Sequence, residues 1–229
     1  VVEQVISSLG GLDVLVNNAG ALFADYKLSP DGFEMTFALN HLGYFLLTHE
    51  LLPLLEKTSG SRVVSTSSAA HQTGKMNLDY IAKRDGKSAG FAAYGDAKLA
   101  NILFTRELHR RYHDRGIAAV SFHPGNVATA FANDTSSVLA LVFGNPLTRL
   151  SLDSPAKAGG KLVWLAEGTP GQTWKSGEFY DNNKVSPYAM PGPEFITYSF
   201  ISDRIESMTG YAVADWHKPK AWFGFMHPE

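Results

Sequence analysis

The sequence predicts an α/β fold in which a mainly parallel sheet is covered by helices on both faces. Short apolar segments alternate along the chain with longer segments of helical periodicity, and this alternation is typical of parallel sheets. The short segments are rich in Val, Leu, Ala and Phe, as expected of strands that are buried on both sides. With 229 residues, of which 45% are hydrophobic and 18% charged, the chain fits a single domain spanning residues 1–229.

The expected elements follow one another in a regular order. The chain opens in the end of an amphipathic helix, which Gly10 or Gly11 terminates. Arginines gather at the end of the helix predicted for 92–114, and Gly116 is placed to stop it. Predicted strands cover 12–17, 62–66, 118–122 and 178–181, and predicted helices cover 31–58 (broken or bent), 92–114, 154–167 and 194–209.

Composition excludes several classes of function. A net charge of −2 gives no basic surface for nucleic acid, and without cysteine there is no disulfide or thiolate ligand. The apolar run 138–143 is far too short for a transmembrane segment. His109 and His113 lie four apart among arginines with no third ligand, so we expect a solvated helix face and no metal. No signal peptide is visible, and we expect a cytoplasmic protein.

The most informative motif is Tyr94-Gly95-Asp96-Ala97-Lys98, downstream of the pair Ser67-Ser68. A tyrosine and a lysine four residues apart share one helix face. A neighbouring ammonium favours the phenolate, so we expect Lys98 to lower the pKa of Tyr94 from its usual value of about 10. That would suit Tyr94 to general acid/base chemistry.

Other polar residues are predicted to lie near this pair. Asn17-Asn18-Ala19-Gly20 and Pro124-Gly125 each follow a predicted strand, and Ser68 closes another. Ligands of open α/β sheets bind at the carboxyl ends of the strands. Asn40 lies inside a predicted helix, where asparagine is mildly unfavourable, so bending the helix or serving chemistry is the expected reason.

Taken in order, these motifs resemble the short-chain dehydrogenase/reductase family. The runs that carry the resemblance are LDVLVNNAG (12–20), NHLGYFLLT (40–48), RVVSTSSAAH (62–71), YGDAKLANILFTRELHRR (94–111) and FHPGNVAT (122–129). The segment after Tyr94, the long stretch between Ser68 and Tyr94, and GEFYDNN (177–183) resemble the retinol dehydrogenase and WW-domain oxidoreductase branch. The resemblance implies a Rossmann-type doubly wound parallel sheet and hydride transfer between a nicotinamide cofactor and an alcohol or carbonyl substrate.

The resemblance also implies a role for each site residue. Tyr94 would exchange a proton with the substrate oxygen, Ser68 would hydrogen-bond that oxygen, and Lys98 would hold the cofactor ribose and stabilise the phenolate. Asn40 would keep a water that links Lys98 to solvent. Expected cofactor contacts are Tyr94 and Lys98 again, Asn17, Asn18, Ala19 and Gly20 on the adenosine side, and Pro124, Gly125, Val127 and Thr129 near the nicotinamide or phosphates.

One element of the family pattern is not found in the sequence. No glycine-rich turn of the kind that binds a cofactor pyrophosphate follows a strand. We therefore expect an amino-terminally truncated chain that lacks the first βαβαβ half, about 60–75 residues at about 30 per βαβ unit. Such a chain is expected to be inactive by itself. Because the residues that select the 2′-phosphate would lie in that half, the cofactor is NADP or NAD, with NADP slightly favoured.

Two other functions stay open at this point. One is a catalytically silent relative that binds a nucleotide or acts as a regulatory module, against which the retention of Asn40, Ser68, Tyr94 and Lys98 speaks. The other is an extended-type epimerase or dehydratase, which shares the Tyr-x-x-x-Lys spacing. The apolar residues within 131–150 suggest either a core helix or a lid that favours apolar substrates. The tail 211–229 has no assignment, and a homo-oligomer is also left open.

Overall fold

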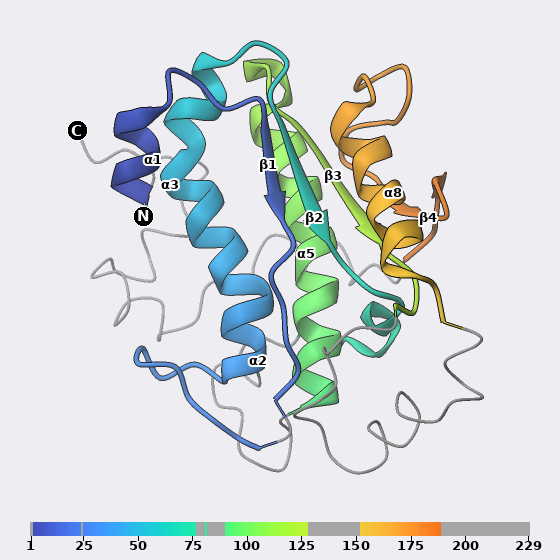
Figure 1. Cartoon of the computed structure of the whole chain (residues 1–229). Helices are drawn as coiled ribbons and strands as arrows, with labels where there is room; N and C mark the ends of the chain where they lie inside the picture. Colours follow the sequence, from blue (N-terminus) through green and yellow to red (C-terminus); the bar gives the residue numbers. More distant parts are fainter. Residues whose placement is uncertain (1, 24, 77–80, 82–89, 128–151, 189–229) are drawn as a thin grey trace.

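The sheet of this protein is built almost entirely from parallel strands (Figure 1). The computed structural model describes residues 2–23, 25–76, 81, 90–127 and 152–188. Its strands lie in the order β1-β2-β3-β4-β5, with β1 to β4 parallel and β5 antiparallel to β4. They span Val14–Asn17 (β1), Arg62–Thr66 (β2), Ala118–His123 (β3), Phe179–Asp181 (β4) and Lys184–Val185 (β5). The predicted parallel α/β fold is confirmed.

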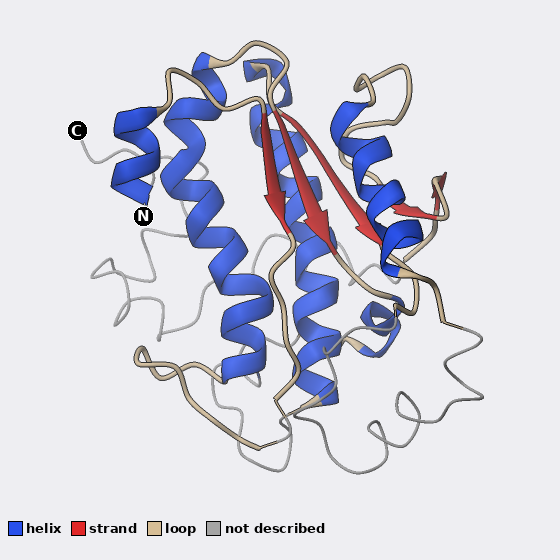
Figure 2. Cartoon of the chain, in the orientation of Figure 1, coloured by secondary structure: helices blue, strands red, loops and turns tan. Residues whose placement is uncertain are grey.

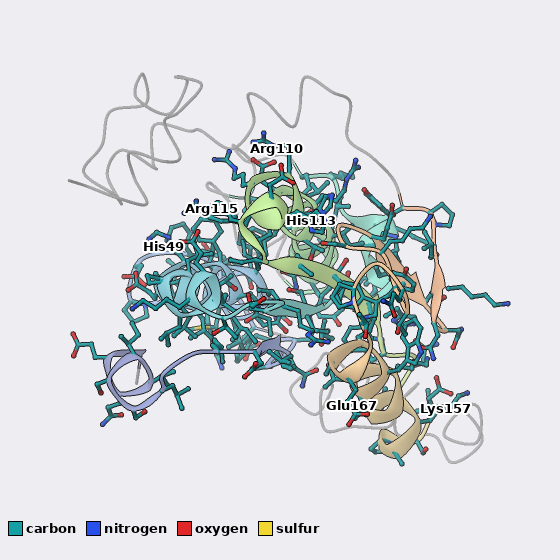
Figure 3. The ribbon with its side chains drawn as sticks, turned by 90° about the horizontal axis from the view of Figure 1, so that it is seen from above. His49, Arg110, His113, Arg115, Lys157 and Glu167 are labelled. Atoms are coloured by element: carbon teal, nitrogen blue, oxygen red, sulfur yellow. The ribbon has the colours of Figure 1, made fainter. Side chains whose placement is uncertain are left out.

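Helices cover both faces of the sheet (Figure 2). Seen from above, α3 and α5 lie on one side of the strands and α8 lies on the other (Figure 3). The α-helices span Val2–Ser8 (α1), Met35–Phe37 (α2), Gly43–Lys57 (α3), Phe91–Tyr112 (α5) and Pro155–Glu167 (α8). Among the described helices, none is long and apolar enough to cross a membrane.

Alternate residues of the central strands supply two separate cores. Val63 packs with α3 and α5, whereas Val64 packs with Leu165 of α8 on the opposite face. This is the pattern expected when successive side chains of a strand point to opposite faces and both faces are buried. Strand β1 lies at the edge of the sheet, and its Val16 remains 37% exposed.

The predicted elements differ from the observed ones mainly in two places. The helix expected over 31–58 begins at Met35 and is interrupted by a π-helical segment, η1 (Ala38–Leu42), in agreement with the expectation that it is broken or bent. Strand β5 was not predicted; it follows a two-residue turn in which Asn182 and Asn183 both have positive φ. The helix predicted for 194–209 lies outside the described residues.

Candidate active site

Ser68, Tyr94 and Lys98 are brought together by two elements, β2 and α5. Ser68 follows β2 and caps the short 3₁₀ helix η2 (Ala69–Thr73), its Oγ accepting from the Ala70 N–H at 3.2 Å. A hydrogen bond joins the Ser68 and Tyr94 side chains. One turn along α5, the Lys98 Nζ lies 5.3 Å from the centroid of the Tyr94 ring. The three residues therefore form one cluster at the carboxyl end of β2.

Asn40 joins this cluster from the π-helical segment η1. Its Nδ2 donates to the carbonyl oxygens of Ala21 at 2.6 Å and Thr36 at 2.7 Å, while its buried Oδ1 has no hydrogen-bond partner. A Cβ on Gly20 would lie only 2.5 Å from that Oδ1 and 3.7 Å from the Lys98 Nζ. Gly20, Asn40 and Lys98 thus meet at one point, and the free Oδ1 can still accept a hydrogen bond there.

Burial decides the protonation of the tyrosine and the lysine. It raises the pKa of Tyr94 to about 12, and the hydrogen bond with Ser68 opposes this only in part. It also lowers the pKa of Lys98 to about 7. The expected lowering of the Tyr94 pKa is therefore not found in the protein alone, because the loss of hydration outweighs the attraction of an ammonium that is itself disfavoured. Lys98 is the group that titrates near neutral pH.

The sequence did not identify two residues of the site, Asn101 and His41. The Asn101 Nδ2 donates to the backbone oxygens of Asn40 at 3.0 Å and Thr66 at 3.1 Å, and the Lys98 Nζ donates to the same Thr66 oxygen at 3.2 Å. Since the Asn101 amide nitrogen is used in this way, its Oδ1 accepts from the His41 Nδ1 at 2.9 Å. Burial lowers the pKa of His41 to about 4, so this ring is neutral at pH 7. Asn101 could have been found from its place three residues after Lys98 on one helix face.

His71 supports the turn that carries Ser68. Its Nδ1 donates to the Ser68 carbonyl oxygen at 2.6 Å, which fixes the ring tautomer when the ring is neutral. The same ring packs edge-on against Phe179 of β4, with the centroids 4.9 Å apart. On the other side, the buried Asp96 carboxylate accepts from the N–H groups of Lys75 at 2.7 Å and Met76 at 3.4 Å. The segment after Ser68 is therefore anchored to both β4 and α5.

The residues predicted to line a cofactor on the β1 side separate into two groups. Asn17 is buried, and its Nδ2 donates to the Thr48 Oγ1 at 2.9 Å, which ties β1 to α3. Asn18, Ala19 and Gly20 are exposed beyond the end of β1, and the Asn18 Oδ1 accepts from the Thr66 Oγ1 at 2.8 Å. The side chain of Asn17 thus faces the interior, while the next three residues remain accessible.

The loop after β3 lies at the same edge of the sheet, because the parallel strands β1, β2 and β3 end side by side. Pro124 and Gly125 follow β3 directly, and Gly125 has a φ of 102°, which an L side chain rarely adopts. Val127 forms a bridge with Asp153. Thr129 lies outside the described residues. The described part of the loop completes an edge lined by exposed or half-buried polar backbone.

Comparison with known proteins points to one family. The profile of the family described as short chain dehydrogenase matches residues 1–139. Retinol dehydrogenase 11 of Homo sapiens is 45% identical over 125 residues, which cover 55% of this chain and 39% of that protein. Retinol dehydrogenase 13 of Homo sapiens is 34% identical over 194 residues, which cover 83% of this chain and 57% of that protein.

A solved structure shares the fold. An NADPH-bound carbonyl reductase from chicken fatty liver matches with a TM-score of 0.55 and 25% identity, covering 81% of this chain and 69% of that one. The predicted Rossmann-type fold is thereby confirmed, as is the resemblance to the retinol dehydrogenase branch. The geometry at the strand ends and these matches lead to one conclusion: this chain belongs to the short-chain dehydrogenase family.

Proposed function

We propose that the protein to which this chain belongs is an NAD(P)-dependent oxidoreductase that interconverts an alcohol and a carbonyl compound. The observation that carries the proposal is the convergence of Ser68, Tyr94 and Lys98, with Asn40 beside them, at the carboxyl edge of a parallel sheet. The matched retinol dehydrogenases and the NADPH-bound carbonyl reductase support it.

Tyr94 is the proton donor to the carbonyl oxygen in the direction of reduction. A tyrosine whose pKa is raised to about 12 is fully protonated at pH 7, as a donor must be. Ser68 is hydrogen-bonded to Tyr94, so both hydroxyls can reach one substrate oxygen and stabilise the charge that develops on it. Lys98, whose pKa lies at about 7, can pass a proton onward at physiological pH.

Asn40 and Lys98 form the route by which Tyr94 can recover the proton that it donates. The unpartnered Asn40 Oδ1 close to the Lys98 Nζ provides an acceptor for an ordered water, as a proton relay to solvent requires. The nearby Asn101–His41 pair keeps the Asn40 and Thr66 carbonyl oxygens in place.

The residues at the sheet edge fit a dinucleotide. Exposed Asn18, Ala19 and Gly20 offer a surface without bulky side chains on one side, and the Pro124–Gly125 turn offers another beside β3. When bound, the nicotinamide supplies or accepts the hydride. The cofactor is NADP or NAD, and NADP is slightly favoured because the matched reductase is described with NADPH bound.

The substrate is a small alcohol or carbonyl compound of apolar character. The matched retinol dehydrogenases favour such a substrate, and the apolar segment within 131–150 is consistent with it, although that segment lies outside the described residues. A homo-oligomer and a cytoplasmic location remain predictions.

Substitution of Tyr94 by Phe tests the proposal. In the full-length gene product, Tyr94→Phe keeps the ring and removes only the hydroxyl, so NADPH oxidation by aldehydes should fall at least 100-fold, in line with the usual worth of general acid catalysis, about 10²–10⁴-fold. Tyr180→Phe is a matched control, because its hydroxyl accepts from the Lys175 N–H, near β4 and away from the cluster. Undiminished turnover by Tyr94→Phe would exclude the proposed role.

A further inference from the structure

A lysine lies in an unusual place on the buried side of α8. Among the residues of this helix, the buried ones are Lys161 and Leu165, which lie one turn apart. Leu165 packs into the core beneath the sheet, as an apolar residue on this stripe should. Lys161 is only 8% exposed, and lysine is almost never buried at this level unless it is paired.

The partners of Lys161 lie in the loop after β3 and directly before α8. Its Nζ donates to the Pro124 carbonyl oxygen at 3.1 Å and approaches the Asp153 Oδ2 at 3.5 Å. The Asp153 Oδ1 meets the exposed Lys157 at 2.6 Å. The Asp153 carboxylate therefore pairs with two lysines. Of these, the buried Lys161 also donates a hydrogen bond to the backbone of the loop.

Asp153 fastens the same loop at two further points. Its N–H donates to the Asn126 carbonyl oxygen at 2.8 Å, and it forms the bridge with Val127. Its carboxylate lies against Gly125, where an added Cβ would be 2.1 Å from the Oδ2. The positive φ of Gly125 and the absence of its side chain are thus what allow the carboxylate to sit there.

The start of α8 holds this carboxylate in position. Ser154 caps the helix, its Oγ accepting from the Lys157 N–H at 3.2 Å, and so sets Asp153 just ahead of the first turn. A negative charge is favourable at a helix N-terminus. The hydrogen bond from Lys157 holds the pKa of Asp153 below its usual range, so the carboxylate stays ionised at neutral pH.

We propose that Lys161 and Asp153 are positioning residues that hold the 124–127 loop in the conformation required by the nicotinamide end of the cofactor. The inference rests on the proposed function, which places that end beside Pro124 and Gly125. Neither residue touches reacting atoms; they act through the loop. If the pair were purely structural, replacing either residue would change the stability of the fold. It would not weaken binding of the nicotinamide end of the cofactor more than binding of the adenosine end.

The test compares Lys161→Met with Lys157→Met in the full-length gene product. Both variants remove one lysine from the same carboxylate, but only Lys161 reaches the loop backbone. Calorimetry measures binding of NADPH and of ADP-ribose 2′-phosphate, which lacks the nicotinamide. Lys161→Met should weaken NADPH about tenfold and leave the fragment within twofold, while Lys157→Met should leave both within twofold.

Hydrogen exchange of the Asp153 amide, whose N–H donates to the Asn126 carbonyl oxygen at 2.8 Å, gives a readout that needs no cofactor. Lys161→Met should speed this exchange about tenfold, and Lys157→Met should not. If Lys161→Met does not fold, Asp153→Asn is measured in its place with the same expectations. The inference would be overturned if Lys161→Met weakened binding of NADPH and of ADP-ribose 2′-phosphate equally. It would also be overturned if the variant changed neither affinity and left the exchange rate unchanged. A wild-type protein that binds neither NADPH nor NADH would instead refute the proposed function, and the exchange arm would still decide whether Lys161 holds the loop.

Discussion

Replacing Gly20 by Ala tests whether the contact between Gly20, Asn40 and Lys98 matters for activity. The added Cβ would lie 2.5 Å from the Asn40 Oδ1, closer than real Cβ atoms approach a neighbour. The Asn40 amide cannot easily turn away, because its Nδ2 is held by the carbonyl oxygens of Ala21 and Thr36. The methyl group therefore displaces the amide and fills the space where its Oδ1 is free.

The size of the effect follows from these contacts. Pushing the amide aside costs roughly 1–3 kcal/mol of overpacking, or one hydrogen bond of about 0.5–1.5 kcal/mol if a carbonyl contact is released. Because about 1.36 kcal/mol corresponds to tenfold in rate, a loss of about 0.5–3 kcal/mol in the transition state would lower kcat about 2- to 160-fold. Gly20 has no positive φ, so alanine brings no backbone strain there.

The assay measures kcat and KM for an aldehyde with NADPH, together with the melting temperature. Gly10→Ala is the matched control, since a Cβ at Gly10 meets nothing within 4 Å. We expect its kcat to equal that of the wild type. If Gly20→Ala retains the kcat of Gly10→Ala, the assignment of Asn40 to a proton relay is wrong.

Two further predictions concern two histidines of the candidate site, His41 and His71. The pKa of His41 is about 4 in the folded protein and 6.5 in the unfolded chain, so the folded ring is neutral at pH 7. Between pH 6.5 and pH 4 the unfolded chain binds a proton that the folded protein does not. The free energy of unfolding therefore falls as the pH drops through this range. By pH 5 the loss should be about 2 kcal/mol at 1.36 kcal/mol per pH unit, and urea unfolding of His41→Gln should lack that part of the slope. His71→Phe keeps a ring against Phe179 but removes the 2.6 Å hydrogen bond to Ser68, so kcat should fall up to about tenfold with little change in the affinity for NADPH. Steady-state kinetics beside NADPH titration check this, and an unchanged kcat would show that His71 does not hold Ser68 in a productive position.

Much of the sheet could be predicted from the sequence because its strands carry a strong local signal. The run 62–66 places the β-branched residues Val63 and Val64 after Arg62 and before a serine and a threonine, and it forms β2 with the expected bounds. The Tyr94–Lys98 spacing could be placed on a helix face for the same reason: both residues lie in one element, whose periodicity is visible.

Features that depend on distant contacts could not be predicted in this way. His41 and Asn101 are 60 residues apart, and only the packing of η1 against α5 brings them together. The direction of the Tyr94 pKa was misjudged because spacing reveals a neighbouring charge, whereas the loss of hydration that dominates comes from the whole fold. Lys161 gave no signal either, since a lysine on a helix is expected to be solvated until its burial is seen.

The transfer of deuterium from NADPH that carries deuterium at both C4 positions of its nicotinamide tests the central claim most directly. The full-length gene product is incubated with labelled cofactor and an apolar aldehyde, and the alcohol is analysed by mass spectrometry. The proposed function predicts one deuterium on the former carbonyl carbon, with formation of this product lost in Tyr94→Phe and retained in Tyr180→Phe. An alcohol without deuterium, or labelled alcohol formed equally fast by Tyr94→Phe, would contradict hydride transfer assisted by this tyrosine.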